Sequence, residues 1–151
     1  MSGRIEILDW WVNSGLKIEY SEDAIYIASK YGYLHILDWW LKSGFELKYD
    51  SDAIYLASKY GYLHILDWWL RSGLKLKHTE RAMDSVSMKG CVHVLDWWLK
   101  SGLPLKYSEK SICGPKFNCA VLKWWVDSGL KLKYTAEGIE SVKKHGGLYL
   151  E

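Results

Sequence analysis

Histidine and cysteine are the residues of this sequence that could hold a metal ion. His35, His64 and His93 recur at intervals of 29 residues, while Cys113 and Cys119 lack a CxxC spacing. Zinc holds each imidazole nitrogen at about 2.1 Å, whereas equivalent positions on packed helices stand roughly 8 to 10 Å apart. We therefore expect surface histidines, and we predict neither a metal site nor a cofactor.

Serine could act as a nucleophile, and a Ser-Gly pair follows each of the five Trp-Trp pairs. The sequence has no glycine-rich phosphate loop, no nucleophile elbow and no His-Glu-x-x-His motif. A reactive serine would not be needed five times, and Ser-Gly is typical of a helix end, where glycine accepts a positive φ. The sequence therefore predicts a protein without enzymatic activity.

Five tryptophan pairs indicate that the chain is built from repeats, and they contain every tryptophan. The pairs are Trp10/Trp11, Trp39/Trp40, Trp68/Trp69, Trp97/Trp98 and Trp124/Trp125. The residue before each pair advances by 29 positions from Asp9 to Asp38, Asp67 and Asp96, and by 27 positions to Lys123. A period of this length is typical of a repeat architecture.

We predict one repeat domain over residues 1–151. It consists of a half unit, 1–20, then whole units 21–49, 50–78, 79–107 and 108–134, and a half unit, 135–151. Terminal repeats of a solenoid normally have a polar outer face, and neither end here departs much from the internal pattern. We therefore expect a segment of a longer array, or a chain whose ends associate with each other.

The pattern of apolar residues within one unit predicts two helices. The second begins after Gly32, and its apolar residues cover one broad arc at 100° per residue. Trp40 falls near the centre of that arc and Trp39 at its edge. We expect Trp40 in the core and Trp39 either at the seam between units or partly exposed, so that Trp40→Ala destabilises more than Trp39→Ala. Asp38 and Lys42, four residues apart on the polar side, predict a surface ion pair.

The first helix of a unit is expected over residues 51–60, with Asp50 or Ser51 as its N-cap. The fourth unit differs, because it is two residues shorter and Pro115 falls in the body of the equivalent helix. Proline removes a hydrogen-bond donor and clashes with the preceding turn. We expect a loop or a single turn there.

The stretch from Ala28 to Gly44, Ala-Ser-Lys-Tyr-Gly-Tyr-Leu-His-Ile-Leu-Asp-Trp-Trp-Leu-Lys-Ser-Gly, resembles the ankyrin repeat. The resemblance rests on the small residues before a variable step, on Gly-x-Leu, on the paired bulky position and on the closing glycine, and it covers nearly the whole chain. It implies an all-α, ankyrin-like solenoid of helix-turn-helix units. The period is shorter than the ankyrin period of about 33 residues, which implies a stack without full β-hairpins. A tetratricopeptide-like helical pair is the alternative fold.

Composition narrows the class of protein. The 151 residues are 49% hydrophobic and carry 20 basic against 18 acidic side chains, which excludes a disordered chain and favours neither a nucleic acid nor a membrane surface as partner. No run approaches the roughly 18 apolar residues of a membrane span, and no signal-peptide core follows Met1. The three cysteines suit small apolar residues in a reducing compartment. We expect a cytoplasmic or nuclear protein.

The first-helix face and the step after it form the predicted partner-binding surface, because ankyrin repeats commonly contact partners there. Tyrosine beside cations suits protein recognition, since tyrosine supplies a large amphipathic contact at low entropic cost. A protein partner of unknown identity is therefore expected. The predicted face consists of Tyr26, Lys30, Tyr31, Tyr55, Lys59, Tyr60, Asp84, Met88, Lys89, Lys144 and His145, with Glu140 beside the last two.

Two other functions fit the same sequence. The tyrosine and lysine columns could stack on and neutralise a single-stranded nucleic acid, whose affinity would fall steeply with salt. The loops would add charge through Lys17, Lys48, Lys75, Lys77, Lys106, Lys131 and Lys133. The near identity of residues 24–44 and 53–73 also suits a structural spacer or an engineered consensus array without a partner.

Overall fold

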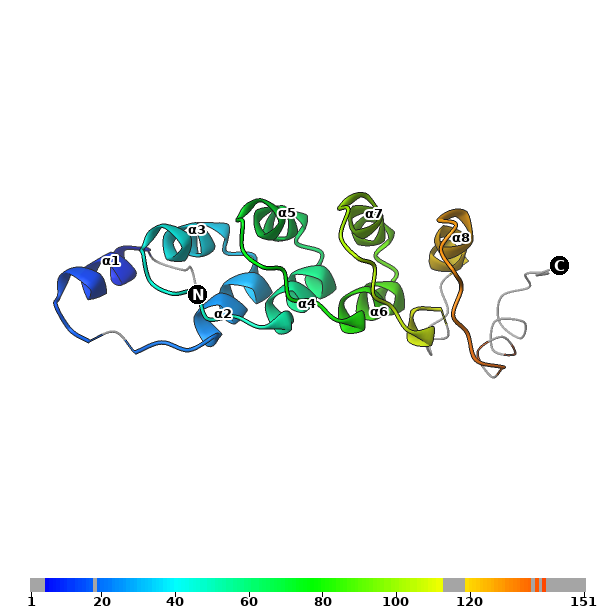
Figure 1. Ribbon diagram of the computed structural model, residues 1–151, viewed down its shortest axis with the longest axis horizontal. Helices are drawn as coiled ribbons and strands as arrows, with labels where there is room; N and C mark the ends of the chain where they lie inside the picture. The colour runs from blue at the N-terminus through cyan, green and yellow to red at the C-terminus, as the bar shows by residue number, and fades with distance from the viewer. Residues whose placement is uncertain (1–4, 18, 113–118, 137, 139, 141–151) are drawn as a thin grey trace. The chain divides into compact units, whose positions relative to one another are not determined.

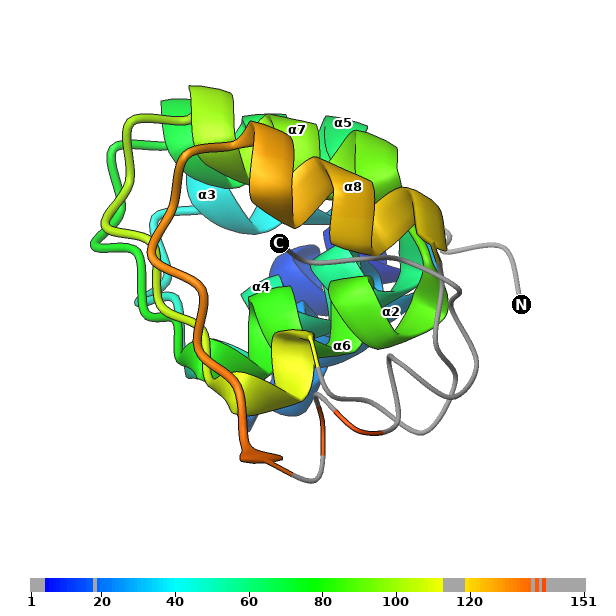
Figure 2. The same ribbon diagram turned by 90° about the vertical axis from the view of Figure 1, so that its right-hand side faces the viewer.

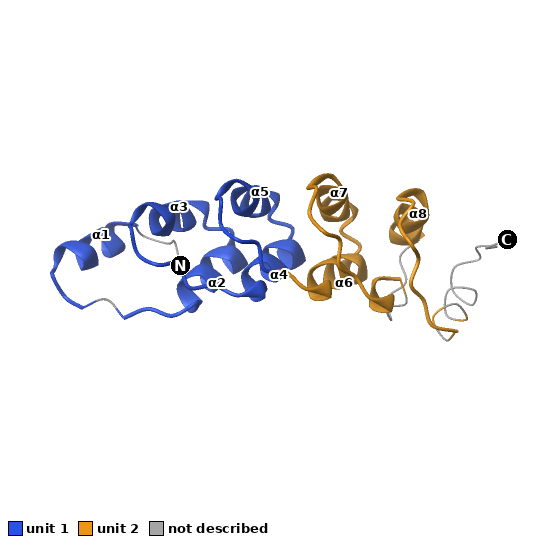
Figure 3. Cartoon of the chain, in the orientation of Figure 1, with its two compact units in different colours: residues 1–77 blue, residues 78–151 orange. Residues whose placement is uncertain are grey.

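The computed structural model describes residues 5–17, 19–112, 119–136, 138 and 140. The chain divides into two compact units, Met1–Lys77 and His78–Glu151, and each is described by itself (Figure 3). All regular secondary structure in the described residues is helical, as the sequence predicts. None of the helices in this part of the chain has the length and apolar character that crossing a membrane requires.

The described part of the first unit is a set of short helices packed in pairs (Figure 1). They are α1 (Ile5–Asn13), α2 (Asp23–Tyr31), α3 (Leu34–Lys42), α4 (Ser51–Tyr60) and α5 (Leu63–Arg71). α2 packs against α4, and each packs against the helix that follows it, α3 or α5; α3 also contacts α1 and α5. The helices predicted after Gly32 and over residues 51–60 are confirmed.

The second unit contains one more helix pair and a shortened repeat. Its elements are α6 (Glu80–Lys89), α7 (Val92–Lys100), the 3-10 helix η1 (Glu109–Ser111) and α8 (Cys119–Asp127). α6 packs against α7 and η1, α7 packs against α8, and the segments that follow α7 and α8 run side by side (Figure 2). In the described residues, a single 3-10 turn stands where the first helix of this repeat is expected to begin, and the predicted break falls on residues 113–118. Pro115 itself lies outside the described residues.

Side chains and glycine set the helix ends. Asp50 Oδ1 accepts a hydrogen bond from the Asp52 N–H at 2.8 Å and caps α4, so the first of the two predicted N-caps is confirmed. At the end of α3 the Ser43 hydroxyl donates to the Trp40 carbonyl oxygen at 2.7 Å, and Gly44 follows with φ of 79°. The Ser-Gly pairs are therefore helix ends.

The second tryptophan of each whole repeat lies in the core. These side chains are at most 3% exposed, and they are Trp40, Trp69, Trp98 and Trp125. The ring of Trp40 packs against Tyr20, with centroids 4.7 Å apart, and against Phe45, at 6.1 Å. The predicted core position of Trp40 is confirmed.

The first tryptophan of a pair links neighbouring repeats. Its indole N–H donates to the aspartate that precedes the tryptophan pair of the repeat before it. The bonds described are Trp39 to Asp9 at 2.6 Å, Trp68 to Asp38 at 2.7 Å and Trp124 to Asp96 at 2.6 Å. The predicted seam position of Trp39 is confirmed, and the seam is held by a hydrogen bond to a charged acceptor as well as by packing.

The aspartates therefore have a second role beside the predicted surface ion pair. Pairs four residues apart are present between Arg71 and Asp67, at 3.7 Å, and in reversed order between Lys123 and Asp127, at 2.9 Å. Both pairs are exposed, and exposed pairs contribute little to stability. The aspartate before each of these tryptophan pairs therefore has a structural role, because it accepts a hydrogen bond from the indole N–H of the following repeat.

An aromatic residue, tyrosine or histidine, and a lysine join the loops of consecutive repeats in a contact that we call the loop clasp. The Tyr20 hydroxyl donates to the Glu46 carbonyl oxygen at 2.8 Å, while Lys48 Nζ donates to the Tyr20 carbonyl oxygen at 3.1 Å and lies 4.7 Å from the ring centroid. The arrangement recurs in Tyr49 with Lys77, His78 with Lys106, and Tyr107 with Lys133. Four of the loop lysines thus bind backbone carbonyls of the chain itself.

Replacing Ser87 by alanine should lower the free energy of unfolding by about 1 to 3 kcal/mol, because the buried Trp125 Nε1, 3.1 Å from the Ser87 hydroxyl, would lose its acceptor. Ser29 and Trp69 occupy the equivalent positions in the first unit, and neither polar group has a hydrogen-bond partner among the described residues. Ser29→Ala should therefore be neutral or stabilising. Urea midpoints measured by circular dichroism compare the two variants, and an equal loss in both would contradict the assignment.

Candidate functional site

The aromatic and cationic residues of the first unit gather where its first helices end and its second helices begin. We call this surface the tyrosine–lysine face. It consists of Tyr26, Lys30, Tyr31, Tyr33 and His35 from α2 and α3, and of Tyr55, Lys59, Tyr60, Tyr62 and His64 from α4 and α5. The face therefore repeats one set of residue types twice on neighbouring helix pairs (Figure 1).

In the first pair, a lysine lies between tyrosine rings. Lys30 Nζ is 5.9 Å from the Tyr26 ring centroid and 5.4 Å from that of Tyr31. Tyr31 stacks on Tyr33 with centroids 5.8 Å apart, and Tyr33 meets the His35 ring at 5.9 Å. The ring faces carry negative charge density, so they hold the ammonium group close to the surface that they form.

The second pair repeats this geometry. Lys59 Nζ lies 5.3 Å from the Tyr55 ring centroid. Tyr60 stacks on Tyr62 at 6.3 Å, and Tyr62 meets His64 at 5.7 Å. The same side-chain types at the same positions of α4 and α5 produce the same local arrangement.

Gly32 joins the two halves of the face. Its φ of 73° favours glycine, and a Cβ added there would lie 3.3 Å from both the Tyr62 ring and His64 Nε2. His64 Nε2 is also 3.1 Å from the Gly32 carbonyl oxygen, within hydrogen-bond distance. Tyr62 and His64, which follow the turn between α4 and α5, thus pack directly on the backbone of the turn between α2 and α3. This contact fixes the spacing between the two halves of the face.

Burial divides the predicted residues of this face. Tyr31 is 52% exposed and Tyr60 is 44% exposed, whereas Tyr26 and Tyr55 are half-buried. The two lysines are also half-buried, because the rings cover their aliphatic stems. The outer surface is formed by the tyrosines at the helix ends, with the lysines beside them.

The prediction that Asp84 belongs to the partner-binding face is wrong, because the structure places this side chain in the interior. It is 8% exposed, and its carboxylate accepts hydrogen bonds from the Ser108 N–H at 2.9 Å and the Ser108 hydroxyl at 2.6 Å. The Ser111 hydroxyl also donates to it. Asp84 occupies the position of Tyr26 and Tyr55, and the short η1 turn brings the two serines onto it. It is therefore not part of an exposed face.

The other predicted residues of the second unit differ in type from those of the first. Met88 and Lys89 are exposed, and they stand at the positions of Lys59 and Tyr60. Glu140 is exposed as well. Lys144 and His145 lie outside the described residues. Among the described residues, the paired tyrosine and lysine pattern therefore occurs only in the first unit.

Sequence reasoning missed Tyr33 and Tyr62, and it treated His35 and His64 only as surface histidines. The signal was the repeated Tyr-Gly-Tyr-Leu-His, whose aromatic residues are spaced two apart on either side of glycine. Only the left-handed turn at the glycine brings the rings into the observed stack.

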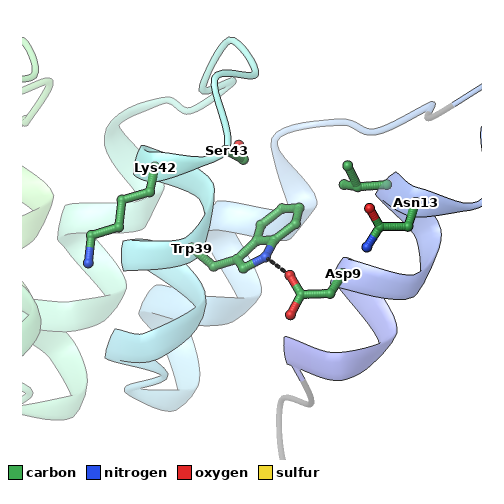
Figure 4. Close-up of a pocket in the computed structure, with 6 residues that line it drawn as sticks. Asp9, Asn13, Trp39, Lys42 and Ser43 are labelled. Atoms are coloured by element: carbon green, nitrogen blue, oxygen red, sulfur yellow. Dashed lines mark hydrogen bonds between the residues drawn. The ribbon is translucent and has the colours of Figure 1, made fainter.

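A groove of about 240 Å³ lies away from this face, between α1 and α3 (Figure 4). It is lined by Asp9, Val12, Asn13, Trp39, Lys42 and Ser43. The Asp9 carboxylate accepts the Trp39 indole N–H, the Ser43 hydroxyl donates to backbone, and Lys42 points away from Asp9 (Figure 4). The polar groups of the groove thus serve the seam and the helix end, and they do not form a nucleophile beside a base.

Metal-ligand geometry is also missing from the part of the chain that the structure describes, where no three His, Cys, Asp or Glu side chains converge. No family model matches the chain, and neither a curated protein nor a solved structure matches it.

Proposed function

We propose that the chain is a non-enzymatic scaffold that binds a protein partner through the tyrosine–lysine face. The proposal includes an ankyrin-like solenoid of helix pairs without full hairpins. The 29-residue period, the resemblance of residues 28–44 to an ankyrin repeat, and the recurring indole–carboxylate bonds and loop clasps support this arrangement.

The observation that carries the binding proposal is the doubled set of tyrosines and lysines in the first unit, in which the tyrosines at the helix ends are exposed. Tyr31 and Tyr60 expose about half of their surface, and both rings are held by stacking on a second tyrosine. Rigid aromatic side chains lose little entropy on binding, and tyrosine is enriched among the residues that dominate protein interfaces.

The test is capture of proteins from a cell lysate on the immobilised chain, compared with the variant Tyr26→Ala/Lys30→Ala/Tyr55→Ala/Lys59→Ala. A partner identified by mass spectrometry is then purified, and its Kd for the variant should rise at least about tenfold, equivalent to about 1.4 kcal/mol. The matched control is Lys42→Ala/Leu70→Ala/Arg71→Ala/Lys75→Ala, which changes four exposed residues away from the face.

Circular dichroism must show that both variants keep the helical content of the parent. Equal loss of the partner in both variants would place binding elsewhere, and capture of no protein by the parent would favour a spacer or engineered array. Because half-buried Tyr26 and Tyr55 also pack inside the unit, the milder variant Lys30→Glu/Lys59→Glu repeats the comparison without changing any ring.

Single-stranded nucleic acid is the second candidate, since stacked tyrosines beside lysines could also stack on bases. The charge of the first unit weighs against it, because residues 1–77 contain nine basic and ten acidic side chains. Nucleic-acid binding depends on many cations that neutralise successive phosphates.

A further inference from the structure

The tyrosine–lysine face contains a pair of cations in stretches without carboxylates. Residues 24–37 and 53–66 include Lys30, His35, Lys59 and His64, and neither stretch contains an aspartate or a glutamate. Each lysine is held near at least one tyrosine ring, with Nζ between 5.3 and 5.9 Å from the centroid. Asp23, Asp38, Asp52 and Asp67 stand immediately outside these stretches. A partner that reaches the two lysines would place its own carboxylates beside the aromatic rings.

The spacing of the two lysines follows from the packing of their helices. Lys30 and Lys59 occupy equivalent positions on α2 and α4, which lie side by side (Figure 1). Packed helices stand roughly 8 to 10 Å apart. A polyproline II segment rises about 3.1 Å per residue and turns once every three residues, so its same-side residues are about 9 Å apart. A peptide with an acidic residue at every third position matches the lysine spacing.

The aromatic part of the face suits the same kind of peptide. Extended, proline-rich segments dock in grooves lined by aromatic residues, because their conformation is already formed before binding. Tyr31 and Tyr60 are the most exposed rings of the face and stand next to the two lysines in sequence. Each three-residue turn of the peptide would thus meet one lysine and one exposed tyrosine.

We propose that the tyrosine–lysine face binds an extended acidic segment of a protein, with carboxylates three residues apart, of the type Asp/Glu-x-x-Asp/Glu. The inference rests on the proposed protein-binding function and adds the chemistry and spacing of the partner. A short segment needs only the two cations present, whereas a nucleic acid would also meet the acidic side chains that make residues 1–77 net negative.

The test uses three fluorescein-labelled peptides of identical composition, in which two glutamates are separated by two, one or four proline or alanine residues. Fluorescence anisotropy with the full chain in 50 mM salt gives each Kd. A peptide with the wrong spacing can still form one of the two surface ion pairs, and the second contributes up to about 1 kcal/mol. The peptide with glutamates at positions i and i+3 should therefore bind up to about fivefold more tightly than the other two.

Charge reversal supplies the matched control. In Lys30→Glu/Lys59→Glu the affinity for the i,i+3 glutamate peptide should fall at least about tenfold, and a peptide with lysines at i and i+3 should bind instead. Lys42→Glu/Lys75→Glu changes the net charge equally at exposed positions away from the face, and its Kd should stay within about twofold of the parent.

Equal affinity for the three spacings would overturn the proposal. If a twenty-nucleotide oligo-dT binds more tightly than the i,i+3 glutamate peptide and its affinity falls steeply with salt, the proposal is also overturned and nucleic acid is favoured as the partner. If no acidic peptide binds while a captured protein is still lost in Lys30→Glu/Lys59→Glu, the inference fails and the protein-binding function stands. If no protein is captured either, both fail.

Discussion

Trp40→Ala is expected to lower the free energy of unfolding by about 3 to 5 kcal/mol, as large-to-small changes of a buried tryptophan do. The Trp40 side chain is 3% exposed and packs against the rings of Tyr20, Trp39 and Phe45. Alanine would leave a cavity at the point where the loop clasp meets the second helix. The measurement is the urea midpoint, followed by circular dichroism.

Two variants of the neighbouring residue serve as controls. Trp39→Ala should cost about 1 to 2 kcal/mol, because Trp39 is only half-buried and less apolar surface is lost. Trp39→Phe keeps a ring and removes only the 2.6 Å bond to Asp9, so about 0.5 to 1.5 kcal/mol is expected. Equal losses for Trp40→Ala and Trp39→Ala would contradict the division between core and seam.

Asp84→Ala is expected to lower the free energy of unfolding by about 2 to 4 kcal/mol, since several hydrogen bonds to a buried carboxylate are lost together. The Ser108 N–H and the hydroxyls of Ser108 and Ser111 all donate to this group. Ser111 is 3% exposed, so its hydroxyl would be left in the interior without this acceptor. Urea midpoints give the loss, and hydrogen exchange at the η1 amides localises it.

Asp84→Asn separates the shape of the side chain from its charge. The amide keeps one oxygen for the Ser108 N–H, and the serine hydroxyls can turn to accept from the amide nitrogen. A smaller loss than in Asp84→Ala is therefore expected. If Asp84→Ala unfolds at the parent midpoint, Asp84 does not hold η1 to α6, and its place on the exposed face would have to be considered again.

Periodicity was sufficient to predict most of the helices. The 29-residue step, the apolar arc around Trp40 and the Ser-Gly pairs indicated two short helices in each repeat, and α3 and α4 have the predicted extents. These features are local, because helix ends depend on caps and glycine, and the buried side of a helix depends on its own residues. The loop or single turn expected in the fourth unit was also predicted from local residues, and the described start of that region is the single turn η1.

The candidate site was only partly accessible to this reasoning. The resemblance to the ankyrin repeat placed Tyr31 and Tyr60 on the partner-binding face, and both are exposed. Helical spacing alone grouped Tyr60 with the apolar side of its helix. The resemblance also placed Asp84 on the partner-binding face, because Asp84 occupies the same helix position as Tyr55. That position meets the following repeat, and a shortened first helix in that repeat presents serines to it. Which side chain is covered therefore depended on a neighbour 24 or more residues away.

By itself, the sequence determined the helix content, the helix ends and the core position of the second tryptophans, since each depends on residues within a few positions of one another. Only the tertiary structure decided the partners of Asp38 and Asp84, and the packing of Tyr62 on Gly32. These contacts join residues between 24 and 30 positions apart. A carboxylate can pair with a cation, an indole N–H or a hydroxyl, and its partner is decided only when helix packing brings one of them within hydrogen-bond distance.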